Sequence, residues 1–446
     1  MKYRLSAIYW LGEWKLIRCR VGVCGGRAFT PIGDRRNNIT ILIMFKRKYE
    51  QLLANAKDYI HYVHGKIKHY KYLYQKMLDR NIIKLAYKKL RKGKTKRKEI
   101  QMIDADLDNE VEAIRETILN TRPCEVPNPE KAYRPHKRTP KIICEHGKFR
   151  KIYMPEIHEQ WIHHIIVLVL EPIIMKTAYP YSCGSFPKRG AHYGKKRIVK
   201  WIRSGKGIRN YVKIDIRHFY ESIILWILMR ELAIRIKDEW FLYIIRLCLK
   251  GFKKGIPLGF YISQWLANYI LEPLDYFIHE VLELHKMIRY MDDIFIFGDN
   301  KKILHGAIIQ IKMLIGRRFR LKLKRNHTVC KFWYRKKNGK VIGRIVDYMG
   351  FLFDREKVLM RKGILIAATR LARKMAEAKK NDRPYYLRRI RSMLSYMGWF
   401  DATNTYDCYL ARIKPYVNIG NMKKIVSKID RRANNGLERG TLLNAA

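Results

Sequence analysis

The sequence contains Met287-Ile-Arg-Tyr-Met-Asp-Asp-Ile-Phe-Ile-Phe-Gly298, in which two adjacent acids are flanked on both sides by strand-forming residues. This pattern predicts a β-hairpin that carries Asp292 and Asp293 at its turn. An isolated Asp-Asp pair is usually a hydrated surface turn, and that is the alternative interpretation. Acids among apolar strands are costly to bury unless a cation neutralises them, so the flanks favour a cation site.

A second acid-bearing strand lies upstream. Tyr211-Val-Lys-Ile-Asp-Ile216 is an apolar run that ends on a carboxylate and then turns into Arg217-His-Phe-Tyr-Glu-Ser222. If this strand lies beside the hairpin, Asp215 meets Asp292 and Asp293. Carboxylate oxygens suit Mg²⁺. The sequence therefore predicts a seat for two Mg²⁺ ions, with Mn²⁺ as a substitute.

Three segments resemble motifs of reverse transcriptases. Tyr290-Met-Asp-Asp293 resembles their active-site box, and Lys213-Ile-Asp215 resembles the acid-bearing strand before it. Between the two, Ile256-Pro-Leu-Gly-Phe-Tyr-Ile-Ser-Gln264 is similar to the Gly-x-x-x-Ser-Gln element of bacterial retroelement enzymes. Each motif alone is moderately specific, whereas three in this order and at these separations are a strong indication.

Further segments extend the resemblance over most of the chain. They are Lys148-Phe-Arg150 with Ile152, the helix from Trp161 to Ile173, the loop Tyr181-Ser-Cys183 with Arg189, Gly190 and His192, and Asp347-Tyr-Met-Gly-Phe351. The Gly-x-x-x-Ser-Gln form, the compact length and the Lys-rich segment near residue 90 most resemble the enzymes of diversity-generating retroelements. Group II intron, retron and defence-associated enzymes share much of the remaining pattern. The loop after Cys183 is longer than in the family pattern. No Cys/His endonuclease module is recognised, so an intron-type homing enzyme is less expected.

The resemblance implies an α+β fold, a right-hand polymerase with fingers, a palm built on an antiparallel sheet, and a helical thumb. We expect a basic helical extension at 44–122, fingers at 123–210, a palm at 211–355 and a helical, basic thumb and tail at 356–446. Within the fingers, β-branched runs predict a hairpin at 142–154, and the apolar run at 157–174 predicts a buried helix after it. Residues 1–43 show neither a 2.0 nor a 3.6 period. A leader ahead of a true start at Met44 and an accessory pair of strands are the two interpretations of that segment.

The resemblance also assigns catalytic roles. Asp215 and Asp292 would be metal ligands, Asp293 a supporting acid, and the backbone carbonyl of Ile216 would complete the shell. One ion would activate a primer 3′-hydroxyl. The other would hold the triphosphate and stabilise the leaving pyrophosphate.

Nucleotide-binding residues are expected around these acids, and the resemblance names Lys148, Arg150, Tyr220, Gly259, Ser263, Gln264, Tyr290, Met291 and Lys322. The two fingers cations would grip the triphosphate. The Tyr220 ring would exclude a ribonucleotide 2′-hydroxyl, and Gly259 would let the backbone approach the templating pair. Gln264 would bond to the incoming nucleotide or the template, and Lys322 would protonate pyrophosphate.

Simpler interpretations stand beside these roles. Tyr220 is otherwise a core aromatic, Ser263 a helix N-cap, and Lys322 an ordinary surface lysine. The fingers cations otherwise contact an RNA backbone generically.

Residues 347–351 resemble a primer-grip turn, with Met349, Gly350 and Phe351 as its contact residues. Trp399 is expected in the thumb core, and stacking on the primer–template is its alternative. His163 and His164 are adjacent on a helix and do not share a face, so we interpret them as packing residues rather than metal ligands.

Charge indicates the partner. The 446 residues contain 93 Lys plus Arg against 39 Asp plus Glu, a formal charge of +54. Such an excess favours a polyanion, and the apolar runs are too short to span a membrane. We expect an RNA template, a DNA or RNA primer and dNTPs as partners, with a structured noncoding RNA and a small basic accessory protein as further candidates. The eight scattered cysteines are typical of a reducing cytoplasm, in a bacterial or phage-encoded protein.

The expected function is RNA-templated DNA synthesis from a primer 3′-hydroxyl, copying a retroelement template RNA to diversify a target gene. A defence-associated enzyme that works on its own noncoding RNA is the alternative biology. A non-catalytic RNA-binding scaffold is the alternative from another class, and the intact acids Asp215, Asp292 and Asp293 argue against it.

Overall fold

The computed structural model describes residues 68–122, 128–136, 139–145, 148–252, 254–381, 383 and 386–434. The chain divides into two compact units, Met1–Leu53 and Ala54–Ala446. All described residues belong to the second unit. The predicted leader at 1–43, and residues 44–67 of the predicted extension, therefore lie outside the described residues.

A four-stranded sheet holds the acids. Its strands are β3 (Asn210–Asp215), β4 (Met287–Tyr290), β5 (Asp293–Gly298) and β6 (Val329–Lys331). They lie in the order β4-β5-β3-β6, and every neighbouring pair is antiparallel. The predicted hairpin is β4–β5, and the predicted upstream strand is β3, directly beside β5. The α+β fold class with antiparallel sheets is therefore confirmed.

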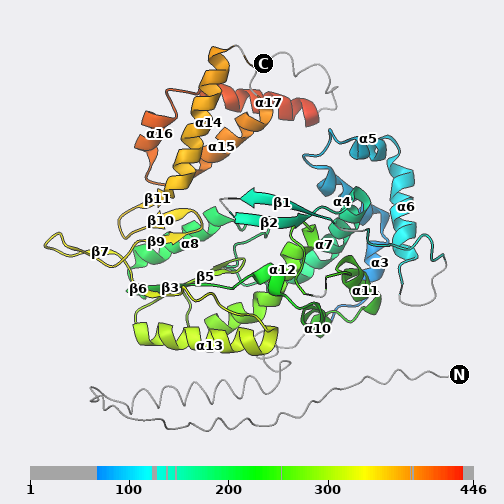
Figure 1. Cartoon of the computed structure of the whole chain (residues 1–446), viewed down its shortest axis with the longest axis horizontal. Coiled ribbons are helices and arrows are strands. Elements are labelled where there is room, and N and C mark those ends of the chain that lie inside the picture. The colour runs from blue at the N-terminus through cyan, green and yellow to red at the C-terminus, as the bar shows by residue number, and fades with distance from the viewer. Residues whose placement is uncertain are drawn as a thin grey trace, which may run out of the picture. The chain divides into compact units, whose positions relative to one another are not determined.

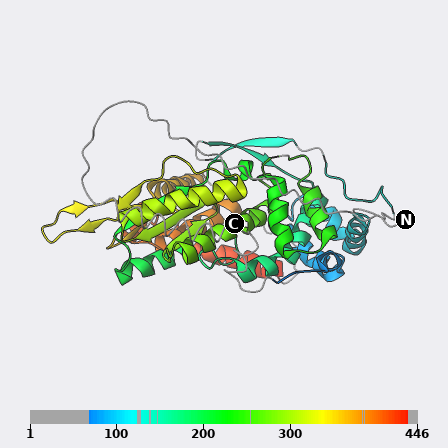
Figure 2. The ribbon, with the colours of Figure 1, turned by 90° about the horizontal axis from the view of Figure 1, so that it is seen from below.

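Alternation of side chains gives this sheet two buried faces. Phe295 and Phe297 of β5 pack in one core with Trp201 of α8 (Ala191–Ser204) and Phe351 of a second sheet. That sheet consists of β9 (Val346–Tyr348), β10 (Phe351–Phe353) and β11 (Val358–Met360). The long helix α13 (Lys301–Phe319) covers the opposite face (Figure 1). A short ribbon, β7 (Tyr334–Arg335) and β8 (Val341–Ile342), projects from this region (Figure 2).

The predicted fingers hairpin is present as β1 (Pro140–Glu145) and β2 (Lys148–Tyr153). It leads into α7 (Ile157–Thr177), which is buried on most faces, as its apolar sequence predicted. The helices α3 (Leu73–Met77), α4 (Arg80–Arg91), α5 (Lys98–Ala105) and α6 (Leu107–Leu119) precede the hairpin, and α4 packs on α7. Within the described part of the chain, no helix has the length and apolar character that crossing a bilayer requires.

The remaining helices surround the sheet or follow it. Four lie between β3 and β4: α9 (Phe219–Ser222), α10 (Leu225–Arg235), α11 (Glu239–Cys248) and α12 (Tyr261–Tyr276), followed by the π-helix η1 (Phe277–Val281). Four more form the C-terminal part: α14 (Lys362–Lys380), α15 (Leu387–Asp401), α16 (Tyr406–Arg412) and α17 (Ile419–Asn434). The C-terminal helices have their own apolar core, which includes Met375, Met393 and Met422. The predicted domain boundaries stay predictions.

Candidate active site

Strand register brings the backbones of the three acids together. Asp215, the last residue of β3, lies directly opposite Asp293, the first residue of β5. Residues Tyr290–Asp293 form the turn between β4 and β5, here called the Asp-Asp turn, and Asp292 lies within it. The Ile216 backbone N–H donates to the Asp292 carbonyl at 3.3 Å and ties the end of β3 to this turn.

One oxygen of the Asp215 carboxylate accepts a hydrogen bond from Lys324. The Lys324 Nζ lies 2.6 Å from Asp215 Oδ2, and the Lys324 backbone N–H donates to the Asp215 carbonyl at 2.8 Å. The other oxygen, Oδ1, is buried and has no hydrogen-bond partner within the described residues. Asp215 thus presents an acceptor that the described part of the protein leaves unsatisfied.

Burial makes it unfavourable for these acids to carry their negative charges. Burial, and then the charge of Asp215, raise the pKa of Asp292. Burial raises the pKa of Asp293 to about 6, and the charge of Lys213 opposes this increase. Desolvated carboxylates of like charge favour protonation unless a cation is bound among them.

The donor set suits a hard divalent cation, which takes carboxylate and backbone oxygens. The unsatisfied Asp215 Oδ1 and the raised pKa values of Asp292 and Asp293 are what a cation bound there would relieve. In the described residues, no three His, Cys, Asp or Glu side chains converge closely enough to form a ready metal cluster. The binding of two Mg²⁺ ions, and coordination of one of them by the Ile216 backbone carbonyl, therefore stay predictions.

Two predicted nucleotide-binding residues lie close to the acids. Burial raises the pKa of Asp292, and the charge of the Arg150 guanidinium on β2 opposes this rise weakly, which places that charge in the neighbourhood of the Asp-Asp turn. Burial, followed by the charge of Asp292, raises the pKa of the Tyr220 hydroxyl. The structure therefore brings the Arg150 and Tyr220 side chains within electrostatic range of Asp292.

Gly259 lies against the fingers hairpin. It has φ +100°, and a Cβ there would collide with the Tyr153 carbonyl and lie 2.8 Å from Ile152 Cγ2. The Tyr153 N–H donates to the Leu258 carbonyl at 2.8 Å. Glycine is thus required to join the hairpin to the loop before α12, and a role beside the templating pair stays a prediction.

The N-cap interpretation of Ser263 is wrong, because α12 begins at Tyr261 and its N-cap is Phe260. Ser263 lies inside the first turn and is 1% exposed, and its Oγ has no hydrogen-bond partner within the described residues. Gln264 is exposed next to it. Their nucleotide contacts stay predictions.

Sequence reasoning chose Lys322 from the run at 320–324, whereas the structure places Lys324 on Asp215. Lys322 is exposed, and its carbonyl accepts from the Arg217 N–H at 2.8 Å. Both lysines alternate with buried leucines, so the sequence pattern predicts that they lie on the same, more exposed face of the segment. It does not show which of the two lysines reaches Asp215. Lys148 opens β2, and its side chain lies outside the described residues.

The predicted primer-grip turn is the connection between β9 and β10. Met349 and Gly350 have φ 52° and 87°, which is the left-handed geometry of a two-residue hairpin. Trp399 packs on Phe351 with ring centroids 4.6 Å apart, and His192 lies 5.1 Å from Trp399. Trp399 is thus part of the contact between helix α15 and this turn, and it is only partly buried against the C-terminal core in which it was expected.

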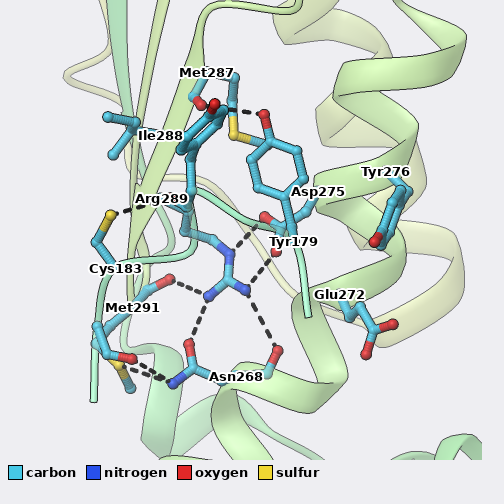
Figure 3. Close-up of polar contacts among 12 residues, drawn as sticks. Tyr179, Cys183, Asn268, Glu272, Asp275, Tyr276, Met287, Ile288, Arg289 and Met291 are labelled. Carbon is cyan, nitrogen blue, oxygen red and sulfur yellow. Dashed lines mark hydrogen bonds and ion pairs between the residues drawn. The ribbon is translucent and has the colours of Figure 1, made fainter. Parts of the chain in front are cut away.

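Sequence reasoning missed a buried polar group beneath the Asp-Asp turn. Arg289 is 1% exposed and is paired with Asp275 of α12 (Figure 3). The available signal was a lone arginine in an apolar strand, because a buried charge needs a partner. The interpretation of His163 and His164 as packing residues is supported by their ring contacts with Phe260 and Tyr261.

Comparison with known proteins agrees with this geometry. Residues 135–351 match the model of the family described as "Reverse transcriptase (RNA-dependent DNA polymerase)". A curated relative, Protein YkfC of Escherichia coli (strain K12), is 22% identical over 191 residues, covering 40% of this chain and 48% of YkfC. The chain thus spans about half the length of that relative.

Solved structures that resemble the chain include two from yeast. Apo telomerase from Candida tropicalis has a TM-score of 0.42 at 12% identity, covering 63% of this chain and 59% of that one. Telomerase from Candida albicans, in complex with a fragment of telomeric RNA, has a TM-score of 0.39 at 11% identity, covering 74% and 63%. The family match, which includes the fingers hairpin, Asp215 and the Asp-Asp turn, identifies residues 135–351 as a reverse transcriptase domain.

Proposed function

We propose that this protein is an RNA-directed DNA polymerase that extends a primer 3′-hydroxyl with dNTPs. The observation that carries the proposal is the register of β3 and β5, which sets Asp215 opposite Asp293 and beside Asp292 within a reverse transcriptase domain. A degenerate scaffold has no need to keep three costly carboxylates together.

Asp215, Asp292 and Asp293 would hold the divalent cations. Bound there, such ions lower the pKa of the attacking hydroxyl and neutralise the charge of the leaving pyrophosphate. The protein's own contribution is to fix the positions of the carboxylates. Lys324 holds Asp215 at 2.6 Å, and the Ile216 N–H holds the Asp292 carbonyl.

The surrounding residues suit a deoxynucleoside triphosphate. Arg150 supplies positive charge near Asp292, which is where phosphates would be bound. The Tyr220 ring, partly buried near the same acid, would leave little room for a 2′-hydroxyl. Removing this ring by Tyr220→Ala should increase rNTP incorporation relative to dNTP incorporation.

The experiment is Mg²⁺-dependent dNTP incorporation on a primed RNA template. The wild type is compared with Asp292→Ala plus Asp293→Ala, and with Asp299→Ala as a control. Asp299 lies just beyond the opposite end of β5, where it accepts from the Arg209 N–H. We expect activity in the wild type and the control and none in the double variant. Equal activity in all three would refute the site.

A wild type that is inactive on the synthetic substrate is then tested with RNA that co-purifies from cells. Activity on that RNA supports a polymerase that needs its own template. Continued inactivity with retained RNA binding supports the scaffold hypothesis instead.

For the biological role, we propose copying of a retroelement template RNA, as in diversity-generating retroelements. The support is the resemblance of Gly259-Phe-Tyr-Ile-Ser-Gln264 and of the whole motif order to those enzymes. Sequencing of the bound RNA tests it. A template repeat that matches a variable gene supports diversification with an accessory protein, whereas a stable noncoding RNA without such a match supports a defence role.

A further inference from the structure

The Asp-Asp turn rests on a buried arginine. Arg289, the residue before Tyr290, points into α12 and is 1% exposed (Figure 3). Its Nε and Nη2 each lie 2.6 Å from an oxygen of Asp275, which is fully buried. Such a two-pronged pair fixes the plane of the guanidinium as well as its position.

The remaining donors of Arg289 reach the turn itself. Nη1 donates to the Met291 carbonyl at 2.9 Å and to Asn268 Oδ1 at 3.0 Å. The Met291 carbonyl belongs to the peptide that joins Met291 to Asp292. Asp275 therefore orients Arg289, and Arg289 holds the peptide bond directly before the first acid.

Asn268 joins the same group from one face of α12, seven residues before Asp275. Its Nδ2 donates to the Gly184 carbonyl at 2.8 Å and lies 3.4 Å from the Met291 sulfur. A Cβ on Gly184 would lie 2.6 Å from two atoms of Met291. The loop at Gly184 and helix α12 thus enclose the Met291 side chain.

The turn needs such support. Met291 has φ 57°, a left-handed conformation that is unfavourable for a residue with a Cβ. Asp292 and Asp293 follow at once and repel each other and Asp215, which would loosen a turn that nothing held. Strained residues of this kind persist when their surroundings over-determine them.

We infer that Arg289 and Asp275 are positioning residues for the reaction, because they fix the Met291 peptide and thereby the two acids that follow it. Asn268 completes the support. None of the three touches substrate in this role. The inference rests on the proposed function for its kinetic consequence only.

A matched control pair, Arg235 of α10 and Glu272 of α12, shares helix α12 with Asp275. Arg235 donates to both oxygens of Glu272, at 3.1 and 2.9 Å, and the two side chains are 8% and 4% exposed. Arg235 also donates to Thr177, and Glu272 lies one turn before Asp275 on α12. This pair resembles Arg289–Asp275 in chemistry and burial but binds α10 to α12 instead of the turn.

The test compares Asp275→Asn with Glu272→Gln in the full chain. Hydrogen exchange followed by mass spectrometry reports on the peptide that contains residues 290–293. We expect exchange there to become about tenfold faster in Asp275→Asn and to be unchanged in Glu272→Gln. Equal acceleration in the two variants, or none in Asp275→Asn, would overturn the positioning role.

Kinetics provide the second measurement. We expect kcat to fall about tenfold to a hundredfold in Asp275→Asn, with KM for dNTPs within about twofold of the wild type, because a misplaced acid slows the chemical step more than it weakens binding. Glu272→Gln should keep kcat. A fall in kcat of the same size in both variants would contradict the inference.

If Asp275→Asn does not fold, Arg289→Lys replaces it, with Arg235→Lys as its control. Lysine keeps a charge for Asp275 but cannot also hold Met291 and Asn268 in one plane. The same exchange and kinetic results are expected. An inactive wild type would count against the proposed function, whereas the exchange measurement would still decide the positioning role.

Discussion

The Asp-Asp turn and the turn between β9 and β10 are both two-residue connections between antiparallel strands, and each contains a methionine in the left-handed region. Met291 has φ 57° and Met349 has φ 52°. The first turn is held by directed polar contacts from Arg289 and Asn268. The second is held by packing of Gly350 against the Trp399 ring and by one backbone hydrogen bond, which the Arg361 N–H donates to the Gly350 carbonyl at 2.9 Å.

The difference follows from what each turn presents. The Asp-Asp turn presents charges whose positions matter, and hydrogen bonds fix position and orientation together. The β9–β10 turn presents backbone and apolar surface, for which close packing is sufficient. The two turns meet where the Tyr348 hydroxyl donates to the Asp293 carbonyl at 2.6 Å. Substitutions that remove a charge should therefore disturb the Asp-Asp turn most, and substitutions that add side-chain volume should disturb the β9–β10 turn most.

The largest effect is expected from Asp215→Asn, which keeps shape and removes charge. We expect the rate of dNTP incorporation to fall about a thousandfold or more, because a neutral amide cannot replace a cation-binding carboxylate. The Asp299→Asn control should keep the wild-type rate. A rate within about tenfold of the wild type in Asp215→Asn would remove this acid from the reaction centre.

A change of volume should affect the other turn. In Gly350→Ala the new Cβ would lie 2.6 Å from the Trp399 ring at φ +87°, so we expect a loss of about 2–4 kcal/mol in the free energy of unfolding. Gly339→Ala is the control, because Gly339 has φ +79° but no atom within 4 Å of its Cβ position. Denaturant unfolding of both variants measures the difference.

The control should lose only about 1 kcal/mol, the cost of the backbone conformation alone. If the two alanine variants lose equal stability, the Trp399 contact contributes nothing to holding the turn. A second variant, Gly350→Ala with Trp399→Leu, should recover part of the loss.

Acid should loosen packing at the start of α12. His164 stacks on Tyr261 with ring centroids 4.0 Å apart. Burial, and then the charges of Lys94 and Lys89, lower its pKa to about 4 from 6.5. The unfolded chain therefore binds a proton at higher pH than the folded chain does, and stability falls as the pH falls from 6.5 to 4.

This residue should account for up to about 3 kcal/mol of that loss. His164→Phe keeps an aromatic ring and removes the titration, so its stability should change less than that of the wild type over this pH interval. Thermal unfolding at pH 7 and pH 4.5 measures it. Parallel pH profiles for the two proteins would show that His164 is not the cause.

The smallest effect concerns the lysine on Asp215. The Lys324 and Asp215 side chains are 39% and 31% exposed, so their ion pair should contribute less than about 1 kcal/mol to stability. Lys324 competes with a divalent cation for the same carboxylate. We expect Lys324→Met to tighten Mn²⁺ binding about two- to fivefold, measured by electron paramagnetic resonance without substrate. Lys322→Met should leave Mn²⁺ binding unchanged. Tighter Mn²⁺ binding in Lys322→Met, with none in Lys324→Met, would show that Lys322 is the lysine at the site.

The sequence predicted the parts of the site that have a local pattern. The apolar flanks of Asp292 and Asp293 predicted a hairpin, and the strand before Asp215 has the same signature, so both are present as expected. The fingers hairpin and the helix that begins at Ile157 followed from β-branched runs and continuous apolar residues.

The missed parts depend on contacts between distant segments. Asp275 lies inside an apolar helix, and nothing local shows that its partner is Arg289, fourteen residues later. Lys322 and Lys324 share one face of the same segment, and only the register of that segment against β3 places Lys324 on Asp215. The N-cap interpretation of Ser263 failed because α12 begins three residues earlier than that pattern suggested, with its N-cap at Phe260.

The central claim is that Asp215 and the Asp-Asp turn form one divalent-cation site. Replacing Mg²⁺ by Fe²⁺ and generating hydroxyl radicals cleaves the backbone next to a bound ion, and mass spectrometry locates the cuts. We expect cuts in both segments, near residue 215 and within 290–293, with both suppressed by excess Mg²⁺ and lost in Asp215→Asn. Cuts in one segment only, or cuts that persist in Asp215→Asn, would contradict it.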